Sequence, residues 1–184
     1  MISSGKIRNT FSVISRLLAF YAANKISKTR PAVLRIEITN RCNISCVMCD
    51  RKAMKRAHVT MEMDLFKKII DDAVLLDIPI VGLNRFGEPM MHPGLLDMVK
   101  YAKGRGVKHL SFTTNATLLT EELAESLIES QCLDEIAFSI DGNSPQTYNK
   151  IRVGADFERV VFNVENFIRI RNKAGLTKPK VQIN

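Results

Sequence analysis

The stretch "AVLRIEITNRCNISCVMCDR", residues 32–51, joins two different patterns. Its first eight residues alternate apolar and polar side chains and are rich in β-branched residues, which predicts a strand over 32–39. Three cysteines, Cys42, Cys46 and Cys49, follow, and the only other cysteine in the sequence is Cys132. In parallel α/β folds ligands bind where strands end, so this cluster of thiols is a candidate ligand site.

Strand-like and helix-like segments alternate along the rest of the sequence. Periodicity predicts helices over 60–76, 93–106, 120–130 and 156–173, with Thr60 and Thr120 as N-caps. It predicts further strands over 78–84, 107–115, 133–141 and 180–184. Strands separated by single helices form parallel sheets, so we expect an α/β fold. Four βα units and the start of a fifth strand do not close a barrel, and we therefore expect the sequence to be a fragment of a longer protein.

Distinctive polar motifs follow each of the first four predicted strands. The cysteines follow the first strand, and the second is followed by "RFGEPMMHP" (85–93). The third and fourth are followed by "TTNATLL" (113–119) and "SIDGNSPQTY" (139–148). The loops at the carboxyl ends of parallel strands converge, so the motifs predict an active site on one rim.

The C-x3-C-x2-C spacing is compatible with three kinds of site. Three thiolates can bind three irons of a [4Fe–4S] cluster and leave the fourth iron open. The alternatives are a zinc site completed by His58 or Asp50, and reduced structural thiols.

Four motifs in this order resemble the radical S-adenosylmethionine (SAM) superfamily: "CNISCVMC" (42–49), "GEP" (87–89), "TTNATLL" (113–119) and "SIDG" (139–142). The resemblance extends from about Leu34 to the C-terminus. It is strongest with the group that carries a C-terminal auxiliary-cluster (SPASM or twitch) domain, related to peptide-modifying and molybdenum-cofactor enzymes. It implies a partial (β/α)6 barrel, here truncated after the fifth strand begins.

The resemblance also implies cofactors and their ligands. Cys42, Cys46 and Cys49 would hold a [4Fe–4S] cluster whose remaining iron chelates SAM. Gly87 and Glu88 would receive the methionyl amino group of SAM. Further matches to SAM contacts are Ser139 and Arg152, for the ribose and carboxylate, with Asn115, Asp141 and Met48 as additional candidates.

Most of these positions also have a structural interpretation. "GEP" and Asp141–Gly142 are turn signals, Arg152 is suited to a surface ion pair with Asp156 or Glu158, and Thr114 and Asn115 are suited to capping a turn. Met48 and Ala116 depart from the family pattern, in which an aromatic residue and a glycine are common. We expect His58, His92 and His109 to be structural or on the surface, and Cys132 to be a buried small hydrophobic residue.

The implied reaction begins with one electron from a donor such as flavodoxin or ferredoxin. Reductive cleavage of SAM then produces a 5′-deoxyadenosyl radical, which abstracts hydrogen from an unknown substrate: a peptide, a sugar or another small molecule. The alternatives are a non-catalytic iron–sulfur or zinc-binding module, and a methyltransferase or methylthiotransferase of the same superfamily.

Residues 1–30 differ in net charge from the core domain, residues 31–184. The first 30 residues contain six basic residues and no acidic one, whereas the other 154 contain 21 basic and 19 acidic residues. The near-neutral core argues against a nucleic-acid partner.

The N-terminal extension contains a predicted helix with apolar residues along one side: Phe11, Ile14, Leu17, Leu18 and Tyr21. This helix is expected to pack on the core, to contact a membrane surface weakly or to be a targeting signal. Clustered reduced thiols favour a cytoplasmic location.

Overall fold

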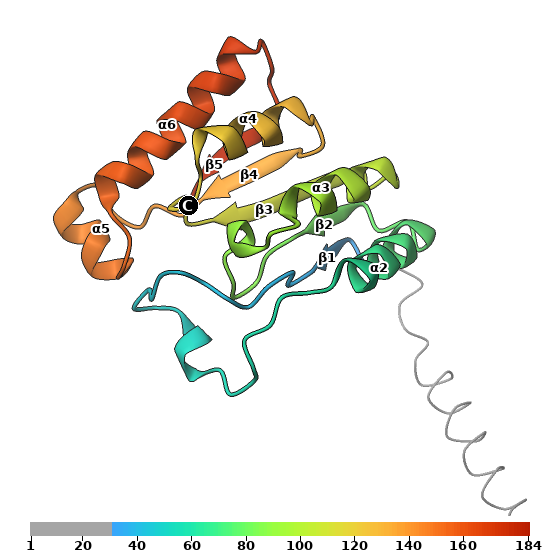
Figure 1. Cartoon of the computed structure of the whole chain (residues 1–184), viewed down its shortest axis with the longest axis horizontal. Coiled ribbons are helices and arrows are strands. Elements are labelled where there is room, and N and C mark those ends of the chain that lie inside the picture. Colours follow the sequence, from blue (N-terminus) through green and yellow to red (C-terminus); the bar gives the residue numbers. More distant parts are fainter. Residues whose placement is uncertain (1–30) are drawn as a thin grey trace, which may run out of the picture. The chain divides into compact units, whose positions relative to one another are not determined.

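The computed structural model describes residues 31–184, so the roles expected for residues 1–30 lie outside the described residues. Five parallel strands form one sheet in the order β1-β2-β3-β4-β5 (Figure 1). They are β1 (Val33–Arg35), β2 (Ile80–Gly82), β3 (His109–Thr114), β4 (Glu135–Phe138) and β5 (Lys180–Ile183). Because spatial order follows chain order, the predicted series of parallel βα units is confirmed.

The first strand is much shorter than the predicted 32–39. Beyond Ile36 the chain leaves β2 and pairs with the segment before the next helix. The Asn40 N–H donates to the Val59 carbonyl at 3.2 Å, and the Met61 N–H donates to the Ile38 carbonyl at 2.8 Å. The alternating pattern therefore continues past the end of β1 because residues 36–39 remain extended against a different partner.

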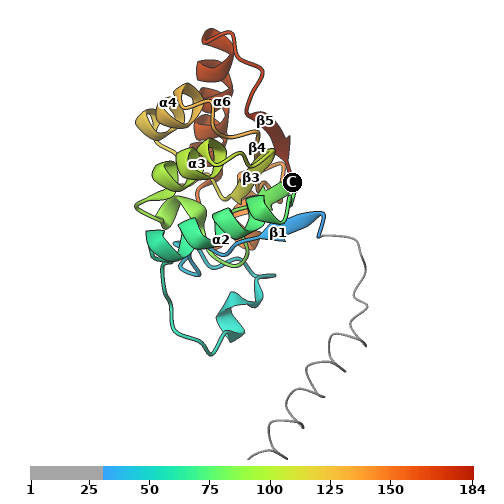
Figure 2. The same cartoon turned by 90° about the vertical axis from the view of Figure 1, so that its right-hand side faces the viewer.

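Four longer helices connect the strands. They are α2 (Met63–Leu75), α3 (Leu95–Gly104), α4 (Glu121–Glu129) and α6 (Phe157–Lys173). Figure 2 shows α2, α3 and α4 along one face of the sheet. None of the helices within residues 31–184 is long and apolar enough to cross a lipid bilayer.

One helix start differs from its prediction. The N-cap of α2 is Glu62 rather than Thr60, and Thr60 instead forms an isolated antiparallel bridge with Thr39. Thr120 caps α4 as predicted, because its hydroxyl accepts the Leu123 N–H at 3.2 Å.

Short helices lie in the loops on the rim. These are α5 (Pro145–Ile151) and two 3-10 helices, η1 (Asp50–Ala53) and η2 (Pro89–Met91). The sequence pattern over 139–148 does not predict α5, which begins inside this motif. Its start has an N-cap, Ser144, whose side chain accepts the Thr147 N–H, and a proline in the first turn.

The two faces of the sheet differ in polarity. On one face, Val81, Leu110 and Phe138 are fully buried under the helices, and Phe138 packs edge-on against Phe167 of α6 with centroids 5.6 Å apart. Burial of each such side chain stabilises the fold by about 1.5–3 kcal/mol. The strand register aligns Arg35, Gly82, Ser111 and Glu135 in one row. That row lacks the branched apolar residues that fill a packed barrel interior, and it suits water or a polar ligand.

Candidate cofactor site

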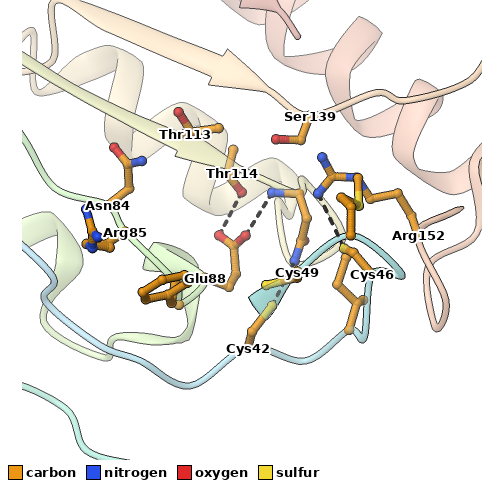
Figure 3. A pocket seen from close by; sticks show the side chains of 15 residues that line it. Cys42, Cys46, Cys49, Asn84, Arg85, Glu88, Thr113, Thr114, Ser139 and Arg152 are labelled. Atoms are coloured by element: carbon orange, nitrogen blue, oxygen red, sulfur yellow. Dashed lines mark hydrogen bonds between the residues drawn. The ribbon is translucent and has the colours of Figure 1, made fainter. Parts of the chain in front are cut away.

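Four loops and the end of α5 line one pocket on the carboxyl-end rim (Figure 3). Its residues are Cys42, Ile44, Cys46, Met48, Cys49, Asn84, Arg85, Phe86, Gly87, Glu88, Thr113, Thr114, Asn115, Ser139 and Arg152. Nine of the ten predicted site residues are on that wall. The tenth, Asp141, is not among the lining residues but forms an ion pair with Arg152, which is.

The three clustered thiols enter the pocket from a single loop. Cys46 is buried, whereas Cys42 and Cys49 are half-buried. The loop turns at this point, since the Cys49 N–H donates to the Cys46 carbonyl at 3.2 Å. Burial raises the pKa of the Cys42 thiol above its ordinary value.

Zinc and a [4Fe–4S] cluster place different demands on these three thiols. Within residues 31–184, no group of three His, Cys, Asp or Glu side chains is positioned to hold a single metal ion. Zinc requires its ligands about 2.0–2.3 Å from one ion. In a [4Fe–4S] cluster, by contrast, each cysteine binds its own iron. Three thiols from one loop, all on the pocket wall, are the donor set that such a cluster takes.

Gly87 allows the loop after β2 to pass against the start of the cysteine loop. A Cβ placed on Gly87 would lie 1.9 Å from the Thr39 carbonyl oxygen and 2.9 Å from that of Arg41. The neighbouring Glu88 N–H donates to the Arg41 carbonyl at 2.8 Å. The "GEP" segment is thus a turn into η2, as its structural interpretation expected, and this turn directs Glu88 into the pocket.

Glu88 is a buried carboxylate, 2% exposed, held by three donors. Its Oε1 accepts the Thr114 hydroxyl at 2.7 Å and the Met90 N–H at 3.0 Å, and its Oε2 accepts the Asn115 N–H at 2.8 Å. Burial raises the pKa of this carboxyl, although the three hydrogen bonds act in the opposite direction. A carboxylate offers about four acceptor positions, so one remains for a further donor, on Oε2.

The loop after β3 is joined to the cysteine loop by amides and a hydroxyl. The side-chain Oδ1 of Asn115 accepts the Thr117 N–H at 3.0 Å, and its side-chain Nδ2 donates to Asn43 Oδ1 at 3.1 Å. Asn43 in turn donates to the Thr117 hydroxyl at 2.7 Å. Asn115 therefore caps a turn, as its structural interpretation expected. Neither Asn43 nor Thr117 is predicted from the sequence as a site residue, although Asn43 directly follows Cys42.

Ala116 stands between these residues with a positive φ of 58°. Glycine takes this left-handed conformation freely, whereas a side chain adds about 1–2 kcal/mol. The loop therefore keeps the left-handed turn that the family's usual glycine would favour, and the alanine side chain adds backbone strain there.

Arg152 does not form the expected surface ion pair with Asp156 or Glu158. Its guanidinium pairs with Asp141, and its Nη1 donates to Cys46 Sγ at 3.6 Å, as Figure 3 shows for the latter contact. The surface-pair alternative is wrong because Arg152, the residue that ends α5, turns inward toward the cysteine loop.

Two backbone hydrogen bonds hold that loop beside the end of α5. The Ser45 N–H donates to the Val153 carbonyl at 2.8 Å, and the Val47 N–H donates to the Ile151 carbonyl at 2.9 Å. These bonds flank Cys46 on one segment and the C-cap of α5 on the other. The two bonds therefore place Cys46 of the cysteine loop opposite Arg152 at the end of α5.

The remaining predicted residues take varied positions. Ser139 is buried on the pocket wall, and Met48 stands at its edge with 52% of its surface exposed. Cys132 is half-buried rather than buried: it packs against the edge of the core, and its thiol donates to the Ser130 carbonyl at 3.0 Å. His92 is structural as expected, since its Nε2 lies 2.9 Å from the Met61 carbonyl.

A family model described as "Radical SAM superfamily" matches residues 36–177. The chain belongs to the radical SAM superfamily. Enzymes of this superfamily use a [4Fe–4S] cluster and SAM, and the similar solved structures include complexes with SAM (AdoMet). The resemblance inferred from the four motifs is therefore confirmed.

Curated relatives extend well beyond the matched region. A "Tungsten-containing aldehyde ferredoxin oxidoreductase cofactor-modifying protein" of Pyrococcus furiosus is 34% identical over 152 residues, covering 82% of this chain and 42% of the relative. A "Probable GTP 3',8-cyclase" of Methanococcus maripaludis is 31% identical over 148 residues, covering 80% of this chain and 48% of the relative. The chain thus spans less than half the length of these two relatives.

Solved structures share the fold at lower identity. Streptococcus suis SuiB bound to its precursor peptide SuiA superposes with a TM-score of 0.69 at 19% identity, covering 84% of this chain and 32% of that one. BtrN in complex with AdoMet and 2-DOIA gives a TM-score of 0.63 at 20% identity, covering 85% and 57%. The expected α/β radical SAM barrel architecture is confirmed.

Proposed function

We propose that the pocket binds a [4Fe–4S] cluster on Cys42, Cys46 and Cys49 with SAM beside it, and that the protein is a hydrogen-abstracting radical SAM enzyme. The observation that carries this proposal is Glu88. It is a buried carboxylate with an acceptor position left over, on the wall of a pocket that three thiols also line. An ammonium group is the donor that best satisfies such a carboxylate, and SAM carries one.

When bound, these groups supply reductive cleavage of SAM and hydrogen abstraction from substrate, with the electron coming from a carrier such as flavodoxin or ferredoxin. The protein's own contribution is to bind and orient. Gly87 keeps the backbone close to the cysteine loop, and Glu88 receives the amino group. The side-chain hydrogen bonds among Asn43, Asn115 and Thr117 hold the cysteine loop against the end of β3.

The outer wall of the pocket would receive the nucleoside part of SAM. Ser139 lies at the carboxyl end of β4 and offers a hydroxyl to the ribose, with the side chain of Asn115 nearby on the same rim. Met48, at the pocket edge, offers a polarizable apolar contact to the adenine. Asp141 acts through its ion pair with Arg152.

Substrate would enter over the polar face of the sheet. The row of Arg35, Ser111 and Glu135 favours a polar substrate, whether a peptide, a sugar or another small molecule. A cytoplasmic location is part of the same proposal, because the thiols must stay reduced before they bind iron.

The test is anaerobic reconstitution with iron and sulfide, followed by electron paramagnetic resonance of the dithionite-reduced protein. We expect a [4Fe–4S]⁺ signal whose shape changes when SAM is added. A signal that ignores SAM would support a non-catalytic iron–sulfur module, and tight zinc without any cluster would overturn the proposal altogether.

A further inference from the structure

We propose that Arg152 is a positioning residue that raises the reduction potential of the cluster by donating a hydrogen bond to the Cys46 sulfur. The inference rests on the proposed function, because it assigns a role beside the cluster that this function requires. It differs from the role that the family resemblance implies, which is contact with the SAM carboxylate.

The contact is direct and sheltered from water. Nη1 of Arg152 lies 3.6 Å from Cys46 Sγ, a distance at which sulfur accepts a hydrogen bond. The Arg152 side chain is only 15% exposed, and Cys46 is 7% exposed. Solvent and salt therefore screen the charge of the guanidinium from the sulfur only weakly.

Asp141 fixes the guanidinium in this orientation. Both Nε and Nη2 of Arg152 pair with the same oxygen of Asp141, which leaves Nη1 directed at the sulfur. The planar guanidinium cannot turn one nitrogen without moving the others. The hydrogen bonds from Ser45 and Val47 to the backbone around Arg152 set the distance between the two segments.

A positive charge beside the sulfur of a cluster ligand changes the free energy of reducing the cluster. Reduction adds one electron to the cluster, taking [4Fe–4S]²⁺ to [4Fe–4S]⁺, and the cluster with its thiolates becomes more negative. Hydrogen bonds to the sulfurs and net charge are among the factors that set the potential of such clusters. A guanidinium on a ligand sulfur stabilises the reduced form more than the oxidised form, so it raises the potential.

The experiment compares midpoint potentials of the full chain after anaerobic reconstitution, without SAM. The potential of each protein is found by titration with dithionite, following the [4Fe–4S]⁺ paramagnetic signal. The variants are Arg152→Gln and Arg152→Lys. Lys150→Gln is the matched control, because it removes one exposed positive charge from the same helix.

Arg152→Gln is expected to lower the ratio of reduced to oxidised cluster about tenfold at a fixed solution potential, a shift of about 59 mV for one electron. Arg152→Lys keeps the charge but cannot hold Asp141 and the sulfur with the same fork, and its potential should lie between those of Arg152→Gln and wild type. Lys150→Gln should match wild type.

Several results would overturn the inference. An unchanged potential in Arg152→Gln, combined with weaker binding of SAM in a separate titration, would assign Arg152 to the SAM carboxylate instead. An equal shift in Lys150→Gln would mean a general charge effect. Loss of iron from both Arg152 variants would make Arg152 a structural support of the loop. Absence of any cluster in wild type would instead reject the proposed function itself.

Discussion

The carbonyl oxygen of Thr39 occupies the space that a side chain on Gly87 would need, because a Cβ there would approach it to 1.9 Å. This contact joins the loop after β2 to the start of the cysteine loop. We expect Gly87→Ala to force these backbones apart and to lower the free energy of unfolding by about 3 kcal/mol. Urea denaturation measures the loss.

Gly104→Ala is the matched control for that substitution. Gly104 is the last residue of α3, and a Cβ there meets no atom within 4 Å. Alanine is favoured in helices by up to about 1 kcal/mol over glycine, so this variant should equal or exceed wild type in stability. If Gly87→Ala proved as stable as Gly104→Ala, the close approach would have no structural importance.

Glu88→Gln should weaken SAM binding at least tenfold while the cluster is retained. The amide NH₂ of glutamine cannot accept from Asn115 or Thr114, and the variant also lacks the charge that attracts an ammonium group. Isothermal titration of reconstituted protein with SAM measures the effect. Glu125→Gln, an exposed change on α4 with the same loss of charge, should bind SAM like wild type. Equal affinities in the two variants would remove Glu88 from the site.

Alanine at Cys42, Cys46 or Cys49 should abolish assembly of the cluster, because three irons each require their own thiolate. Cys132→Ala provides the control, since Cys132 is outside the pocket and bonds only locally to Ser130. Iron and sulfide are counted per chain after anaerobic reconstitution. Equal iron in the triple alanine variant and in wild type would reject the cysteine assignment.

Asp134 should make the stability of the core depend on pH in acid. Burial acts to raise the pKa of Asp134, but hydrogen bonds from Lys103, Lys178 and the Leu110 N–H lower it from 3.8 to about 2. Because the folded-state pKa is depressed, the stabilisation is present above about pH 4 and is lost as the pH falls toward about 2. Lowering the pKa from 3.8 to about 2 corresponds to about 2 kcal/mol of stabilisation.

The measurement for Asp134 is urea unfolding of wild type and Asp134→Asn at several pH values. The wild type should be more stable by about 2 kcal/mol at pH 7, and the difference should vanish near pH 2. Glu121→Gln, which breaks the exposed pair with Arg169, should change stability by less than about 1 kcal/mol. A constant difference between wild type and Asp134→Asn across the pH range would contradict the assignment.

Local patterns predicted the fold because its elements are periodic and simply ordered. Alternation and helical spacing identified every strand and every long helix. Two predictions failed where a distant partner decided the local structure. Thr60 pairs with Thr39 instead of capping α2, and the extended chain beyond Ile36 leaves the sheet.

The site could be predicted to the level of its motifs, since the loops after parallel strands converge. The contacts between those loops could not be predicted. The partner of Arg152 is Asp141 rather than the acidic residues next to it in sequence, and Asn43 of the cysteine loop bonds to Thr117 of the loop after β3. Such contacts depend on how neighbouring βα units are placed in space, which periodicity does not encode.

The hydrogen bonds from the cysteine loop to the end of α5 have a consequence for biosynthesis. Cys46 and Arg152 are 106 residues apart, so the thiols leave the ribosome long before Ile151 and Val153 are made. Until then the N–H groups of Ser45 and Val47 lack these carbonyl acceptors. If the thiols hold the proposed cluster, a nascent chain halted before α5 should therefore capture it poorly.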